Sequence, residues 1–99
     1  MDWDALMEEA EELAVRLKQT GVDLNEAEKV LGYYLYKNCD EKAMSRYLEL
    51  MATSPPLRSK KTQVHYRTIR SLWMSWRTGL RGADKARAWG WAVRLARVR

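Results

Sequence analysis

The chain has 99 residues, which is enough for one hydrophobic core but not for two, so a single domain spanning residues 1–99 is predicted. Hydrophobic residues make up 46% of the chain and charged residues 31%, proportions that are typical of globular proteins and exclude a disordered tail. With one cysteine (Cys39) and one histidine (His65), the chain excludes an intrachain disulfide and a structural Cys/His zinc cluster.

The net charge of +5 is unevenly distributed along the chain. Residues 1–52 carry twelve acidic and six basic residues, a net charge of −6, whereas residues 53–99 carry one acidic residue (Asp84) and twelve basic residues, a net charge of +11. Such asymmetry indicates a polyanionic partner, or a head-to-tail assembly in which acidic and basic halves of neighbouring copies meet.

Two amphipathic helices are predicted in the acidic half. Apolar residues recur at helical spacing from Trp3 to Leu17, and Gly21 is expected to end this first helix in a left-handed conformation. A second helix is predicted to begin at about Asn25, which is a suitable N-cap. Its expected buried face consists of Ala27, Val30, Leu31, Tyr34 and Leu35.

A short polar break at residues 38–40 precedes a third predicted helix, for which Asp40 is the expected N-cap. Because the break is short, the second and third helices are expected to pack as neighbours. The Thr53-Ser54-Pro55-Pro56 segment ends the third helix, since proline donates no backbone hydrogen bond and restricts the preceding residue. This Pro-Pro turn separates an acidic half (1–52) from a basic half (57–99).

A long fourth helix is predicted from about Ser59 to Thr78, closed by Gly79 and Gly82, and a fifth from about Ala83 to the C-terminus. No period-2 alternation bounded by turn signals occurs, so an all-α, compact bundle of about five helices is expected. No apolar run approaches the roughly 18 residues that span a bilayer, and the acidic start lacks the basic region of a secretory signal. The sequence therefore predicts a cytoplasmic protein with no membrane partner.

Projection of the fourth helix at about 100° per residue separates an apolar arc from a basic one. The apolar arc contains His65, Ile69, Leu72, Trp73, Trp76 and Leu80, and the opposite arc contains Lys60, Gln63, Arg67, Arg70, Arg77 and Arg81. A row of guanidinium groups on a rigid helix suits a phosphate backbone, because each planar fork binds two phosphate oxygens. Lys60 and Lys61 also stand at the helix N-terminus, where anions are favoured. The alternative interpretation is an ordinary solvated face.

The sequence contains no motif of an enzyme, a cofactor site or a metal site, since Walker, GxGxxG, HExxH and CxxC patterns are all missing. We therefore expect a non-catalytic protein without cofactors, in which His65 is a hydrogen-bonded core residue. Tyr33, Tyr36 and Tyr66 project away from the apolar faces, where they are available to stack on nucleic-acid bases or on a neighbouring subunit.

The fifth helix has two apolar faces. Ala88, Trp91, Ala92 and Leu95 form one face and Ala86, Trp89 and Val93 form another, with a narrow strip of Arg87, Arg94 and Arg97 between them. Two faces that require burial indicate either a central position in the domain or a contact with another chain. Trp89 is expected to point into the domain and Trp91 toward an assembly contact.

The run from Lys85 to Arg97 resembles the closing helix of the small subunits of type III CRISPR effector complexes, in which a tryptophan on an Ala/Leu-rich helix is followed by a basic residue and an apolar pair. Residues 62–69 resemble the Gln-x-x-(aromatic)-x-x-Ile/Val helix start of that group, here with Gln63, Tyr66 and Ile69. Together the two motifs cover about a fifth of the chain.

This resemblance implies a small, all-α, non-catalytic subunit that stacks in copies along a ribonucleoprotein filament. Such a subunit would contact RNA, as a guide–target duplex or as a single strand, and other subunits of the complex. Motif matching nominates Arg67 and Arg94 as nucleic-acid-binding residues, whereas Lys60, Lys61, Arg70, Arg77 and Arg81 follow only from the charge pattern.

Two alternatives remain open at this stage. A helix-turn-helix DNA-binding regulator would place the fourth helix in the major groove, but the short Gly-containing turn and the Asn/Gln mixture that reads adenines are missing. A protein–protein adaptor would use the same basic face to meet an acidic partner.

Overall fold

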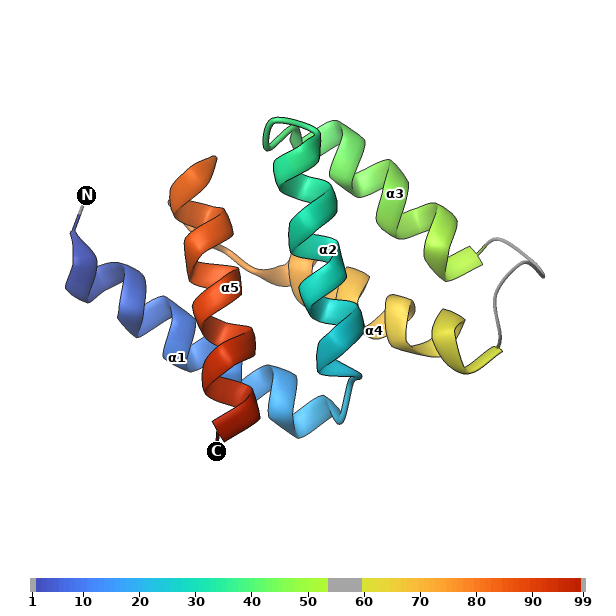
Figure 1. The fold of residues 1–99 in the computed structure, drawn as a ribbon, viewed down its shortest axis with the longest axis horizontal. Coiled ribbons are helices and arrows are strands. Elements are labelled where there is room, and N and C mark those ends of the chain that lie inside the picture. The colour runs from blue at the N-terminus through green and yellow to red at the C-terminus, as the bar shows by residue number, and fades with distance from the viewer. Residues whose placement is uncertain (1, 54–59, 99) are drawn as a thin grey trace.

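Five α-helices form the fold in the computed structural model, which describes residues 2–53 and 60–98 (Figure 1). No strand occurs among the described residues, so the predicted all-α bundle is confirmed. The predicted Pro-Pro turn and the start of the fourth helix at Ser59 lie outside the described residues. The helices are α1 (Trp3–Thr20), α2 (Leu24–Tyr36), α3 (Glu41–Thr53), α4 (Lys60–Ser75) and α5 (Ala83–Val98).

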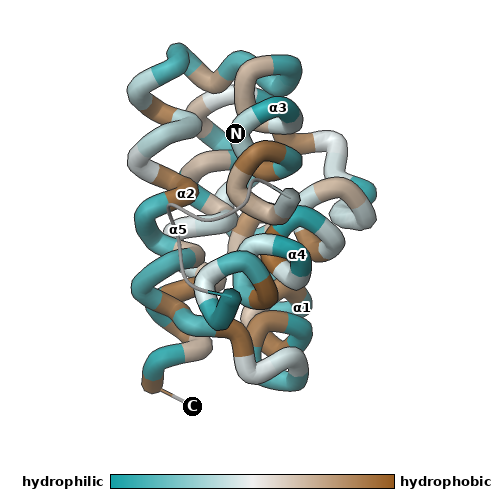
Figure 2. The backbone as a smooth tube through the Cα atoms, turned by 90° about the vertical axis from the view of Figure 1, so that its right-hand side faces the viewer, coloured by the Kyte–Doolittle hydropathy of each residue, from teal (hydrophilic) through white to brown (hydrophobic). Residues whose placement is uncertain are grey.

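The helices are arranged in two layers. Helices α2 and α5 lie side by side in one layer, α1 and α4 cross behind them, and α3 runs along α4 at one edge (Figures 1 and 2). Hydrophilic and hydrophobic residues alternate along each helix, as expected for amphipathic helices (Figure 2). The predicted contact between the second and third helices forms through Tyr33, whose ring stacks on Tyr47 at a centroid distance of 3.9 Å, while α3 packs mainly against α4.

Side-chain caps fix the starts of the first three helices. The carboxylate of Asp2 accepts hydrogen bonds in the first turn of α1, and Gly21 ends this helix with a φ of 67°, as predicted. The predicted cap at Asn25 is wrong, because the carboxylate of Asp23 accepts the Asn25 N–H at 2.8 Å and the helix begins at once after Asp23. Asp40 caps α3 as predicted.

The fourth helix ends at Ser75, three residues before the predicted end at Thr78. After Ser75 the chain turns: the Trp76 N–H bonds to the Trp73 carbonyl at 3.3 Å, and the Thr78 hydroxyl accepts the Leu80 N–H at 3.0 Å. These local bonds replace the next helical turn. Helix α5 begins at Ala83, as predicted.

Helix α5 occupies the central position that its two apolar faces indicated. It packs against α1 on one side and α2 on the other, so both faces find partners inside the domain. Trp89 is fully buried as predicted, whereas Trp91 is half-buried and packs edge-on against Trp3 at 6.0 Å. The other buried residues of α5 are Ala86, Ala88, Ala92, Val93 and Ala96.

An aromatic cluster joins α2, α4 and α5. The ring of Trp73 lies 5.0 Å from Tyr34, 5.2 Å from Trp89 and 5.8 Å from Trp76, all in edge-to-face geometry. The Trp89 indole N–H donates a 2.8 Å hydrogen bond to the Ala27 carbonyl. Trp76, predicted to be buried, is only half-buried because it follows the end of the helix.

A charged residue covers this cluster. The ammonium of Lys85 lies 4.3 Å from the Trp73 ring centroid and 2.9 Å from a Glu41 carboxylate oxygen, and only 12% of its side chain is exposed. The Tyr34 hydroxyl donates to the other carboxylate oxygen of Glu41. Burial and the Glu41 carboxylate raise the pKa of Tyr34 above its ordinary value. Burial and a hydrogen bond with Tyr47 likewise raise the pKa of Tyr66.

Replacement of Trp89 by alanine should lower the free energy of unfolding by about 3–5 kcal/mol, because it empties a fully buried site and leaves the Ala27 carbonyl without the indole donor. Trp76→Ala should have a smaller effect, since this side chain is half-buried. Urea unfolding followed by circular dichroism measures both values. Equal losses of unfolding free energy in the two variants would show that Trp89 contributes no more to the core than Trp76.

Alkaline pH should destabilise the protein through its buried tyrosines. In the unfolded chain Tyr34 and Tyr66 ionise near the ordinary value of 10.0, whereas in the folded chain their raised pKa values keep them protonated. The free energy of unfolding should therefore fall as pH rises above about 10. Urea unfolding at a series of pH values checks this prediction. The free energy of unfolding should fall less with pH in Tyr34→Phe than in the unmodified protein. In the control Tyr36→Phe, in which an exposed tyrosine is replaced, it should fall as much as in the unmodified protein.

Candidate nucleic-acid interface

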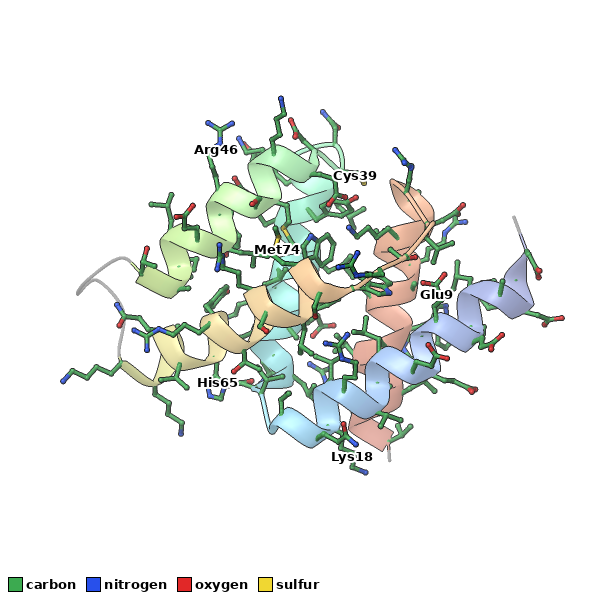
Figure 3. The ribbon with its side chains drawn as sticks, turned by 180° about the vertical axis from the view of Figure 1, so that it is seen from behind. Glu9, Lys18, Cys39, Arg46, His65 and Met74 are labelled. Carbon is green, nitrogen blue, oxygen red and sulfur yellow. The ribbon has the colours of Figure 1, made fainter. Side chains whose placement is uncertain are left out.

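The outer face of α4 carries four of the predicted basic residues. The buried residues of α4 are Tyr66, Ile69, Leu72 and Trp73, which direct the opposite side of the helix to solvent. Lys60, Lys61, Arg67 and Arg70 are all exposed. Helix α4 lies in front in Figure 3, where its residue Met74 is labelled. Val64 and Met74 are exposed on the same helix, so the face is mixed and not purely charged. We call this surface, with its four basic residues, the α4 face.

No residue of the α4 face forms an ion pair with a described acidic residue. The ion pairs within the described residues are Lys29–Glu26, Lys85–Glu41, Arg87–Asp84 and Arg97–Glu28. These pairs join residues of α2, α3 and α5, and none of them includes a residue of α4. Among residues 2–53 and 60–98, no carboxylate therefore pairs with the charges of the α4 face.

Arg67 is held by the end of α3. Its Nε–H donates to the Ala52 carbonyl at 3.4 Å, close to the C-terminus of α3, where carbonyl groups lack helical partners. This contact holds the Nε side of the guanidinium group, while the residue as a whole is exposed. The arrangement provides a positioned donor for an anion.

Arg77 and Arg81 do not continue this surface as a helical row. Both are exposed, as expected, but they lie in the connection between α4 and α5, because α4 ends at Ser75. The predicted straight row from Lys60 to Arg81 is therefore wrong beyond Arg70. The error follows from a projection that assumed a continuous helix.

Arg94 lies in the other layer. It belongs to α5, its guanidinium carbon is 5.0 Å from the Trp91 ring centroid, and it lines a groove between α2 and α5. The structure therefore divides the seven predicted residues into the α4 face, the connection after it, and Arg94 on the opposite layer (Figure 1).

Arg16 was not predicted to be a nucleic-acid-binding residue, although it lies beside the α4 face. Helix α1 crosses α4, and Arg16 donates a 2.7 Å hydrogen bond to the Ser75 hydroxyl. A shallow hollow of about 380 Å³ lies between the two helices. It is lined by Arg16, Gln19, Thr20, Arg67, Thr68, Ser71 and Leu72. Arg16 lies in the acidic half of the sequence, so only the packing of α1 on α4 brings it here.

The tyrosines proposed for base stacking have different surroundings. Tyr66 is 1% exposed, so the expectation that it projects outward is wrong; its ring turns toward α3 to contact Tyr47. Tyr33 is already stacked on Tyr47. Tyr36 is 77% exposed and has the Lys37 ammonium 5.4 Å from its ring centroid. Of these three tyrosines, Tyr36 alone offers an open ring.

His65, predicted to be a hydrogen-bonded core residue, accepts a 3.1 Å hydrogen bond from the Asp23 N–H through Nδ1. The hydrogen bond is confirmed, but the core position is wrong, because the side chain is only partly buried. Residues 2–53 and 60–98 contain no group of three or more His, Cys, Asp or Glu side chains arranged to hold a metal ion. Among the helices of these residues, none combines the length and the apolar character needed to cross a lipid bilayer.

Comparison of the chain with protein-family models, with curated proteins and with solved structures gave no match.

Proposed function

We propose that this protein is a non-catalytic, nucleic-acid-binding subunit that contacts a phosphate backbone through the α4 face. The observation that carries this proposal is the group of exposed cations on one helix, Lys60, Lys61, Arg67 and Arg70, none of which pairs with a described carboxylate. Arg16 extends the positive surface across the hollow between α1 and α4.

The chemistry of the α4 face favours backbone binding over reading of base sequence. Its donors are mainly ammonium and guanidinium groups, which bind phosphate oxygens of any sequence. The hollow beside it adds the side chains of Thr20, Thr68 and Ser71, which are of the kind that bind phosphate and sugar oxygens. We therefore expect binding with little base preference.

The narrower form of the proposal is a small subunit of a type III CRISPR effector, which holds RNA together with other subunits and with copies of itself. Its support is the resemblance of the two sequence motifs and the opposite charges of the two halves of the chain. The motif from Lys85 to Arg97 lies in α5, where Trp89 and Val93 are core residues, and Tyr66 and Ile69 of the motif at residues 62–69 are buried as well. Core packing therefore accounts for the apolar positions of both motifs, and their basic positions, Arg67 and Arg94, carry the narrower form.

Binding of single-stranded RNA to the isolated protein should weaken steeply with salt. If about four phosphates are neutralised, the logarithm of the binding constant should fall with the logarithm of salt concentration at a slope of about −3. Fluorescence anisotropy of a labelled oligonucleotide measures this slope. A slope near zero would contradict the proposed backbone contact.

The double variant Lys60→Gln, Arg70→Gln should weaken RNA binding at least about tenfold and reduce the salt slope by about 1.4, since two cations are removed. Neither side chain is bonded to a described residue, so the fold should persist. The matched control is Lys29→Gln, Lys37→Gln, which removes the same charge from α2 and from its C-cap residue, in the other layer. An equal loss in both variants would show that net charge, and not the α4 face, governs binding.

A further inference from the structure

A groove with an apolar lining runs between α2 and α5, on the opposite layer from α4. Its volume is about 660 Å³. Leu31, Leu35, Trp91 and Val98 line it, and Leu35 is 51% exposed although it was predicted to be buried. Gly90 lets Leu31 pack closely on α5 in the floor, because a Cβ atom at this position would lie 3.1 Å from a methyl group of Leu31. Leu35 is exposed, and the partly buried Leu31 and Trp91 lie beside it, so the apolar surface is contiguous, as at many interaction sites.

The rim of this groove is basic. Arg87, Arg94 and Arg97 of α5 line it, together with a single acidic residue, Glu28. Arg97 lies 2.8 Å from Glu28, so these two charges compensate each other. Arg87 has only a long contact of 3.7 Å with Asp84, and Arg94 pairs with no described carboxylate. The groove therefore presents uncompensated positive charge beside an apolar floor.

We propose that the groove between α2 and α5 binds an acidic amphipathic helix of a protein partner. Leucine-type side chains at helical spacing would enter between Leu31, Leu35 and Trp91, as in helix-in-groove recognition. Arg87 and Arg94 are seven residues apart, about 10.5 Å along α5, which matches two carboxylates at positions i and i+7 of a docked helix. Tryptophan and arginine are the residues that most often dominate such interfaces.

A second copy of this chain fits the groove less well. The acidic helical face that the described chain offers is the outer side of α1, with Asp4, Glu8 and Glu12. Its exposed apolar residues are Trp3, Ala5 and Val15. Trp3 already packs edge-on against Trp91 of its own chain, so Ala5 and Val15 are what remains, too little to fill a floor made of two leucines and a tryptophan. The occupant is therefore a different chain that combines carboxylates with large apolar residues. This inference does not depend on the nucleic-acid proposal, which concerns the other layer.

The probe for this groove is a synthetic, fluorescently labelled peptide of about 18 residues, with leucine at i, i+3, i+4 and i+7 spacing and glutamate on the opposite face. Two control peptides carry lysine in place of glutamate, or the same residues with the leucines scrambled around the helix. The full-length protein should bind the acidic amphipathic peptide at least about tenfold more tightly than either control. Equal affinities for the three peptides would overturn the proposal.

Two pairs of variants locate the binding. Leu35→Gln should weaken peptide binding about tenfold, whereas Leu50→Gln, at a leucine of α3 that is 62% exposed and outside the groove, should leave it unchanged. Arg94→Glu should reverse the preference between the acidic and the lysine peptide, and Arg46→Glu on α3 should not. Thermal melting of each variant confirms that it is folded. Equal effects within either pair would place the peptide elsewhere and overturn the proposal.

Two further outcomes would assign the groove to another occupant. A dimer of the unliganded protein that disappears in Leu35→Gln, observed by sedimentation, would show that a second copy fills it. A loss of RNA binding in Leu35→Gln would show that the groove belongs to the nucleic-acid surface. Loss of RNA binding only in the Lys60→Gln, Arg70→Gln variant would leave this inference intact, because that variant changes the opposite layer.

Discussion

The packing of Trp73 against Tyr34 and Trp89 is the contact on which the arrangement of the layers depends. It joins α4 to α2 and α5 at a single point in the core. The ten aromatic residues include no phenylalanine, so every ring carries a polar atom that needs a partner when buried. The bonds of Trp89 to the Ala27 carbonyl and of Tyr34 to Glu41 meet this requirement and also fix how the helices are rotated relative to one another.

The two layers consequently present surfaces of different chemistry. The α4 face carries cations that pair with no described carboxylate, while the groove between α2 and α5 combines an apolar floor with a basic rim. The proposed occupants differ accordingly, a phosphate backbone on one side and an acidic helix on the other. A chain of this size that binds both would bridge a nucleic acid and a protein without needing a second domain.

Helical periodicity was sufficient to predict the five helices, the end of α1 at Gly21, the cap at Asp40 and the start of α5. It failed where local bonds competed with it: a turn after Ser75 ended α4 early and removed Arg77 and Arg81 from the basic row. No local sequence pattern predicted that Arg16 lies beside the α4 face, or that a groove forms between α2 and α5. Both features arise where helices that are distant in sequence pack together.

The largely buried amine of Lys85 offers a way to observe local opening of the core. Its amine lies over the Trp73 ring and is mostly shielded from water, unlike the lysines on the outside of the helices. Reagents that acylate amines reach it freely when its contacts with the Trp73 ring of α4 and with Glu41 of α3 open. The rate at which this one amine is labelled, compared with the surface lysines, is therefore a measure of how often α5 opens locally from α3 and α4.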